Sequence, residues 1–171
     1  ISVVQLKNFS ETARKKIKSR IKNYYPNTSE KGLQGKYVTR NQPGMNTKGF
    51  FLDTEYAHKG VNDRMDIVWV DTAAKTIAFV ELKKFSNQEL LLTSENFVLE
   101  QLTKYHTLIK KEKSYLLEHY QKVFRIKKII GVFRSDLTID SLANFSILEK
   151  PVLLVGDCTQ AWIDEFTPAI N

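Results

Sequence analysis

The sequence predicts a mixed α/β (α+β) domain built around a central sheet. Two apolar runs, Ile67–Val70 and Thr76–Val80, flank a short polar break, which is typical of two strands joined by a tight turn. A long segment after them carries apolar residues at helical spacing. The 171 residues, 42% of them hydrophobic, suffice for one well-buried core, so we expect a single domain over residues 1–171.

The elements before the hairpin follow from caps, breakers and periodicity. A first helix is expected from Ser10 to Tyr24, with Ser10 as its N-cap and Pro26 ending the run. Residues 27–48 are polar and show little periodicity, which predicts a long, mostly irregular connection. The segment 49–56 predicts a strand, and 57–64 a turn that leads into the hairpin.

The second half of the chain predicts one long helix and further strands. We expect the helix from about Ser94 to Lys122. Its apolar stripe comprises Val98, Leu102, Tyr105, Ile109 and Leu116. Residues 127–133 and 152–155 predict two more buried strands, and 159–166 a short terminal helix.

Composition narrows the classes of function. The 26 basic and 19 acidic residues give a net charge of +7, which suits a polyanionic partner such as nucleic acid. The single cysteine, Cys158, excludes internal disulfides, and the three scattered histidines do not predict a zinc site. No membrane span or signal peptide is apparent, so a cytoplasmic location is expected. The chain begins at Ile1, and we therefore expect that it can belong to a longer protein.

The ends of the two predicted hairpin strands bring charged residues together. A turn centred between Ala73 and Ala74 places Asp66 opposite Glu81, where like charges destabilise a hairpin. Strand alternation puts Lys83 on the same face as Glu81. Two carboxylates at this spacing can share a hard divalent cation, beside which a lysine can orient a water. A solvated cluster in which Lys83 merely neutralises the acids is the alternative.

A second pair of polar residues lies on the predicted long helix. Gln101 and Tyr105 are one turn apart and therefore project from the same face. The amide and the hydroxyl suit contacts to a phosphate or to water. Ordinary packing of Tyr105 in the core explains its position equally well.

Taken together, Arg64-Met65-Asp66, Glu81-Leu82-Lys83 and the Gln101–Tyr105 helix resemble the PD-(D/E)xK nuclease superfamily, in its branch with a RecB-like Gln-x-x-x-Tyr helix. The resemblance covers roughly residues 49–120. It implies a restriction endonuclease-like fold, with a central mixed sheet flanked by helices. Met65 departs from the family pattern, in which proline is common at this position.

The resemblance also implies an activity, namely metal-dependent hydrolysis of phosphodiester bonds in DNA, of a restriction, repair or recombination type. Asp66, Glu81 and the backbone carbonyl of Leu82 would hold Mg²⁺ or Mn²⁺. Lys83 would position the attacking water and stabilise negative charge, and Gln101 and Tyr105 would orient the nucleic acid. These residues form the expected catalytic set.

Further candidate residues complete the expectation. Glu11 and Glu55 are candidates for the additional acid found in many members of the superfamily. Nucleic-acid contacts are expected from the basic residues Arg14, Lys18, Arg64 and Lys84.

Other functions remain open at this point. A catalytically silent domain of the same fold would bind nucleic acid or a protein without cleaving anything. An unrelated α/β protein would carry a solvated salt-bridge cluster instead. A homodimer or further domains are possible partners.

Overall fold

The computed structural model describes residues 29–41, 48–58, 64–90, 97–133 and 139–158, together with Thr12, Lys15, Ser19, Arg20 and Leu137. The four isolated N-terminal positions are helical, in agreement with the predicted first helix. Glu11, Arg14, Lys18 and the predicted helix over 159–166 lie outside the described residues. No helix in the described part of the chain is long and apolar enough to span a membrane.

The prediction of an irregular connection over residues 27–48 is wrong, because helix α3 occupies Glu30–Arg40. Ser29 is its N-cap, and the Ser29 hydroxyl accepts a hydrogen bond from the N–H of Gly32 at 3.0 Å. Leu33, which is buried, packs against Gly156 at the end of strand β5 (Val152–Gly156). Capping and tertiary packing therefore form this helix, rather than a periodic apolar stripe.

Three antiparallel strands follow α3: β1 (Gly49–Ala57), β2 (Arg64–Asp71) and β3 (Thr76–Lys84). The pairing of β2 with β3 runs from Ile67 opposite Val80 to Asp71 opposite Thr76, so the predicted hairpin and its turn centre are confirmed. Strand β1 pairs with the other edge of β2.

Strand β3 lies at the centre of a mixed sheet. The edge of β3 that faces away from β2 pairs in parallel with β5 and with the short strand β4 (Ser146–Ile147). Strand β4 was not predicted from the sequence. Because parallel strands lie on one edge of β3 and an antiparallel strand on the other, the predicted central mixed sheet is confirmed.

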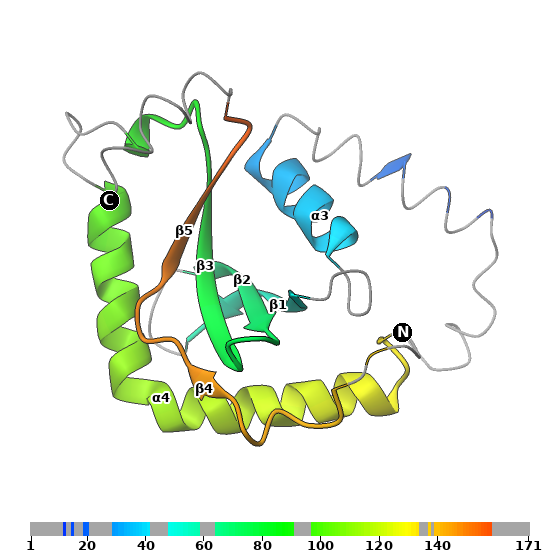
Figure 1. Cartoon of the computed structure of the whole chain (residues 1–171). Coiled ribbons are helices and arrows are strands. Elements are labelled where there is room, and N and C mark those ends of the chain that lie inside the picture. Colours follow the sequence, from blue (N-terminus) through cyan, green and yellow to red (C-terminus); the bar gives the residue numbers. More distant parts are fainter. Residues whose placement is uncertain are drawn as a thin grey trace.

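The two long helices lie on opposite sides of this sheet (Figure 1). Helix α4 (Phe97–Ile129) extends further than predicted, and the strand predicted over residues 127–133 is wrong, since α4 continues to Ile129 and a turn follows. The short 3-10 helix η1 (Gln88–Leu90) lies between β3 and α4. The core between α4 and the sheet includes the buried side chains of Phe50, Phe79, Tyr105, Ile109, Leu116, Tyr120 and Phe124.

Candidate functional site

Asp66 and Glu81 meet where the ladder between β2 and β3 ends. The last paired residues are Ile67 and Val80, so Asp66 and Glu81 occupy the next position on each strand. The N–H of Leu82 donates a hydrogen bond to Asp66 Oδ2 at 2.9 Å, which joins the two strands by a side chain at this point. Burial raises the pKa of Asp66, while the hydrogen bond from Leu82 opposes this effect. The predicted juxtaposition of the two acids is present.

Glu81 is a buried carboxylate with an unused oxygen. The residue is only 3% exposed, and its Oε1 lies 3.1 Å from Lys83 Nζ. Its Oε2 is buried and has no hydrogen-bond partner among the described residues. Burial, and next the nearby charge of Asp66, raise the pKa of Glu81 to about 7. A buried carboxylate oxygen without a partner, such as Glu81 Oε2, is unfavourable unless it binds a proton or a cation.

Lys83 is held between two carboxylates. Besides Glu81, its ammonium contacts Glu89 Oε2 at 2.7 Å, and Glu89 belongs to η1. Burial by itself would lower the pKa of Lys83, but hydrogen bonds to Glu89 and Glu81 raise it above its ordinary value. The lysine is therefore a fixed, charged group. Glu89 was not predicted as a site residue, because in the sequence it is only an acidic residue shortly after the strand.

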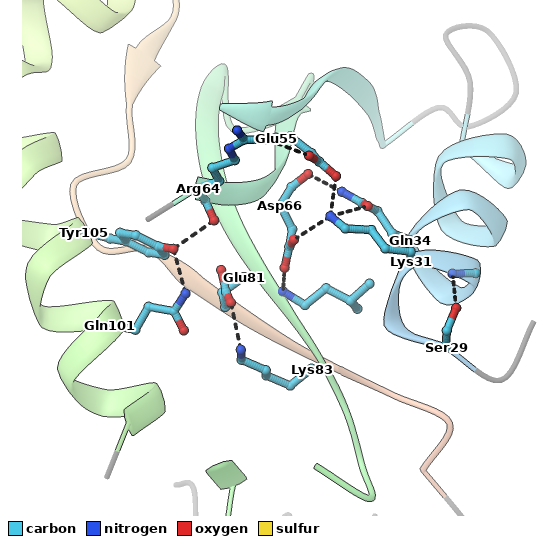
Figure 2. Close-up of polar contacts among 12 residues, drawn as sticks. Ser29, Lys31, Gln34, Glu55, Arg64, Asp66, Glu81, Lys83, Gln101 and Tyr105 are labelled. Carbon is cyan, nitrogen blue, oxygen red and sulfur yellow. Dashed lines mark hydrogen bonds and ion pairs between the residues drawn. The ribbon is translucent and has the colours of Figure 1, made fainter. Parts of the chain in front are cut away.

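Helix α3 approaches Asp66 from the other side (Figure 2). The side-chain amide of Gln34 donates a hydrogen bond to the backbone carbonyl of Asp66 at 2.5 Å. The Lys31 ammonium contacts the Glu55 carboxylate and lies 3.6 Å from Asp66 Oδ1. Both residues belong to the segment predicted to be irregular, so sequence reasoning missed them.

Glu55 shares a row with the two other acids. Thr54 pairs with Ile67 and Tyr56 with Met65, so Glu55 lies opposite Asp66 between these pairs. Its φ of 56° is in the left-handed region, although strand β1 continues through this residue to Ala57.

The Glu55 carboxylate is satisfied by two cations. It contacts Lys31 and lies 3.5 Å from Arg64 Nη1. The hydrogen bond from Lys31 lowers the pKa of Glu55. Of the two predicted additional acids, Glu55 thus lies near Asp66, and Glu11 is outside the described residues.

Gln101 and Tyr105 extend the site onto α4 as predicted. The Gln101 amide donates to the Tyr105 hydroxyl at 2.7 Å, and this hydroxyl donates to the carbonyl of Arg64 at 2.9 Å. The chain of hydrogen bonds connects α4 to the first residue of β2 (Figure 2). The nearby Gln101 amide has a smaller effect on Glu81 and opposes the rise of its pKa. Tyr105 is 1% exposed, so it belongs to the core as well as to the site.

The predicted nucleic-acid contacts lie at the margin of this cluster. Arg64 is exposed and is directed towards Glu55. Lys84 is half-buried, and its backbone N–H donates to Glu30 Oε1 at 3.1 Å. The same Glu30 oxygen accepts a hydrogen bond from Asn87, so Glu30 fixes the end of β3 to α3.

The donor set fits a hard divalent cation in part. Asp66 and Glu81 offer carboxylate oxygens, which Mg²⁺ and Mn²⁺ prefer, and Glu81 Oε2 is unpartnered. The N–H of Leu82 points to Asp66, and the carbonyl of an extended residue lies on the same strand edge as its N–H. Within the described ranges, no group of three or more His, Cys, Asp or Glu residues could hold a metal. The remaining ligands would be Leu82 and water.

Comparisons with known proteins found no match for this chain. No protein-family model, no curated protein and no solved structure matches it. The function must therefore be argued from the site itself.

Proposed function

We propose that this chain is a metal-dependent nuclease of the PD-(D/E)xK superfamily, with a restriction endonuclease-like fold, that hydrolyses phosphodiester bonds in DNA. The observation that supports this most is the buried, unpartnered Oε2 of Glu81, next to Asp66 and with the Lys83 ammonium 3.1 Å from the other Glu81 oxygen. A buried carboxylate with a free oxygen is costly unless a cation or a proton completes it.

Asp66, Glu81 and the Leu82 carbonyl would hold Mg²⁺ or Mn²⁺. When bound, the ion supplies Lewis-acid stabilisation of the charge that develops on the phosphate oxygens. The mixed sheet, with α3 and α4 on its two sides, agrees with the proposed fold at the level of element types.

The residues of this chain have separate roles in the proposed reaction. A water attacks phosphorus and one ester P–O bond breaks, which leaves a phosphomonoester and a hydroxyl group. Lys83, held by Glu81 and Glu89, positions that water and stabilises the negative charge of the transition state. Gln101 and Tyr105 fix the edge of the site and orient the nucleic-acid backbone.

The net charge of +7 supports a polyanionic substrate, and the resemblance to the nuclease superfamily makes DNA the substrate that we propose. Arg64 and Lys84, at the margin of the site, are the proposed contacts to phosphates, with Arg14 and Lys18 as further candidates. A cytoplasmic location, and a homodimer or further domains of a longer chain as partners, belong to the same proposal.

Cleavage assays test the proposal directly. Linear, circular and single-stranded DNA would be incubated with the protein and Mg²⁺, with Mn²⁺ or with EDTA. Asp66→Asn keeps an acceptor for the Leu82 N–H but removes the charge, and should abolish cleavage. Asp140→Asn, at an exposed ion pair with Lys128, is the matched control. Equal cleavage by the wild-type protein and Asp66→Asn would reject the proposed site.

A second candidate function is a catalytically silent domain that binds nucleic acid or a protein. The charge balance of the site favours this second function, because each acid already has a basic neighbour. Lys31 and Arg64 contact Glu55, and Lys31 also lies beside Asp66. Lys83 contacts Glu81, so the protein itself counters all three carboxylates. This function predicts that the protein shifts DNA in a gel with equal affinity in Mg²⁺ and in EDTA, and that no product forms.

A further inference from the structure

Lys31 occupies a central position between two acids of the site. Its ammonium contacts the Glu55 carboxylate, lies 3.6 Å from Asp66 Oδ1 and lies 3.2 Å from Gln34 Oε1. Figure 2 shows the Lys31 side chain reaching from α3 towards Asp66 and Glu55, whereas Lys83 lies beside Glu81. A cation supplied by the protein therefore already lies beside a proposed metal ligand.

The oxygens of Asp66 differ in what they can still accept. Oδ2 receives the hydrogen bond from the Leu82 N–H at 2.9 Å. Oδ1 faces Lys31 across 3.6 Å, beyond the normal range of a hydrogen bond. Oδ1 is thus the oxygen most free to bind a divalent cation, and it is the oxygen that Lys31 approaches.

We propose that Lys31 is a built-in competitor for the metal, an ammonium that must leave Asp66 before a divalent cation can bind there. The inference rests on the proposed function, because it assumes that Asp66 is a metal ligand. It concerns the regulation of that site, which would bind metal more weakly than its carboxylates alone allow.

Electrostatics requires the displacement. An ammonium and a divalent ion on the same carboxylate oxygen repel each other strongly at a separation of a few ångströms. Lys31 has another partner in Glu55, so it can keep one ion pair while it gives up the other. Its side chain is 41% exposed, and its long stem can therefore move without repacking of the core.

Measurement of metal affinity tests the inference without any activity assay. Mn²⁺ would be titrated into the wild-type protein and into Lys31→Met by calorimetry, at one pH and ionic strength. We expect Lys31→Met to bind Mn²⁺ on the order of tenfold more tightly, a modest factor because solvent screens a half-exposed ammonium. Unchanged or weaker binding would overturn the inference.

Two controls isolate the contact from the general loss of charge. Lys36→Met removes one exposed ammonium from the same helix and should bind Mn²⁺ as the wild type does. An equal gain in Lys36→Met would show that only net charge matters, and would overturn the inference. Lys31→Gln is the second variant should Lys31→Met fail to fold, and the same gain is expected of it.

Asp66→Asn separates this inference from the proposed function. If the wild type and Asp66→Asn bind Mn²⁺ equally, Asp66 is not a ligand and both are rejected. If Asp66→Asn loses binding while Lys31→Met equals the wild type, the metal site stands and only the role of Lys31 is overturned.

Discussion

Replacing Glu81 by glutamine should stabilise the metal-free protein at pH 8. The substitution keeps the shape of the side chain and removes a carboxylate that is 3% exposed and has one unpartnered oxygen. The new amide can still accept a hydrogen bond from Lys83 through Oε1. The variant removes the cost of a buried negative charge, and the NH₂ group that takes the place of the unpartnered Oε2 offsets part of this gain.

The pKa of Glu81 sets the size and the pH dependence of the effect. Folding raises this pKa from an ordinary 4.5 to about 7, so the folded protein binds more protons than the unfolded chain between these values. Stability of the wild type is then full below pH 4.5 and falls as the pH rises through 7. Each pKa unit corresponds to about 1.4 kcal/mol, which gives a total loss of roughly 3 kcal/mol.

Urea unfolding in EDTA at pH 5 and pH 8, followed by circular dichroism, measures the effect. The free energy of unfolding of Glu81→Gln minus that of the wild type should rise by about 2–3 kcal/mol between these pH values. In thermal unfolding this corresponds to a change of about 5–10 °C in Tm for a domain of this size. Glu118→Gln, at an exposed pair with Lys122, should show no such pH dependence.

Two results would refute the reasoning. A difference in stability that is the same at pH 5 and pH 8 would mean that Glu81 does not titrate in this range. A variant less stable than the wild type at pH 8 would mean that the contact with Lys83 stabilises the protein by more than burial of the carboxylate costs.

Three further predictions address the neighbours of Glu81. Lys83→Met should bind Mn²⁺ at least as tightly as the wild type in calorimetry and lose turnover in the cleavage assay, because the lost ammonium no longer repels the metal but also no longer positions water and stabilises charge; weaker binding with normal turnover would contradict this. Tyr105→Phe should lower the free energy of unfolding by about 1–2 kcal/mol in urea, since the carbonyl of Arg64 loses its donor; an unchanged midpoint would show that water replaces the hydroxyl. Gly156→Ala should lower the free energy of unfolding by about 1–3 kcal/mol, because the alanine Cβ would lie 2.3 Å from Leu33 Cδ2. The loss should be smaller in a Leu33→Ala background, and equal losses would rule out this clash.

The hairpin and its acids could be predicted because local rules determine them. Two short apolar runs on either side of a polar break identify the strands, and the position of the turn fixes the register from Asp71–Thr76 onwards. The one-turn spacing of Gln101 and Tyr105 likewise follows from helix geometry alone. Most of the candidate site was therefore accessible from the sequence.

Helix α3 could not be predicted because its stability comes from tertiary contacts. Gly32 and Gly35 lower its helix propensity, and Leu33 contacts Gly156, which is more than a hundred residues away in sequence. The contacts of Lys31 and Gln34 with Asp66 could not be predicted from the sequence for the same reason. The local signals that could have suggested this helix were the N-cap Ser29, with Glu30 in the first turn and Arg40 in the last.

Residues 127–133 were assigned to the wrong element because a short apolar run fits both a strand and a helix. Contacts of Lys127 explain why this segment is helical. Its ammonium donates to the carbonyl of Leu52 at 2.5 Å and lies 3.3 Å from Asp53 Oδ1. These contacts hold the end of α4 against β1. Ile129 is largely exposed, which a buried strand would not allow.

The electrostatics of the acid row connects the two proposals. Glu55, Asp66 and Glu81 lie on neighbouring strands; Lys31 contacts the first two of these acids and Lys83 the third. If the cluster only stabilised the fold, a glutamine at position 81 would satisfy the same neighbours without a buried charge. A carboxylate with an unpartnered oxygen is favoured over an amide where a further cation can bind. The destabilisation that ionised Glu81 should cause at pH 8 is therefore the best physical reason to look for that cation. Addition of Mn²⁺ should offset this destabilisation in the wild type, and should stabilise Glu81→Gln less.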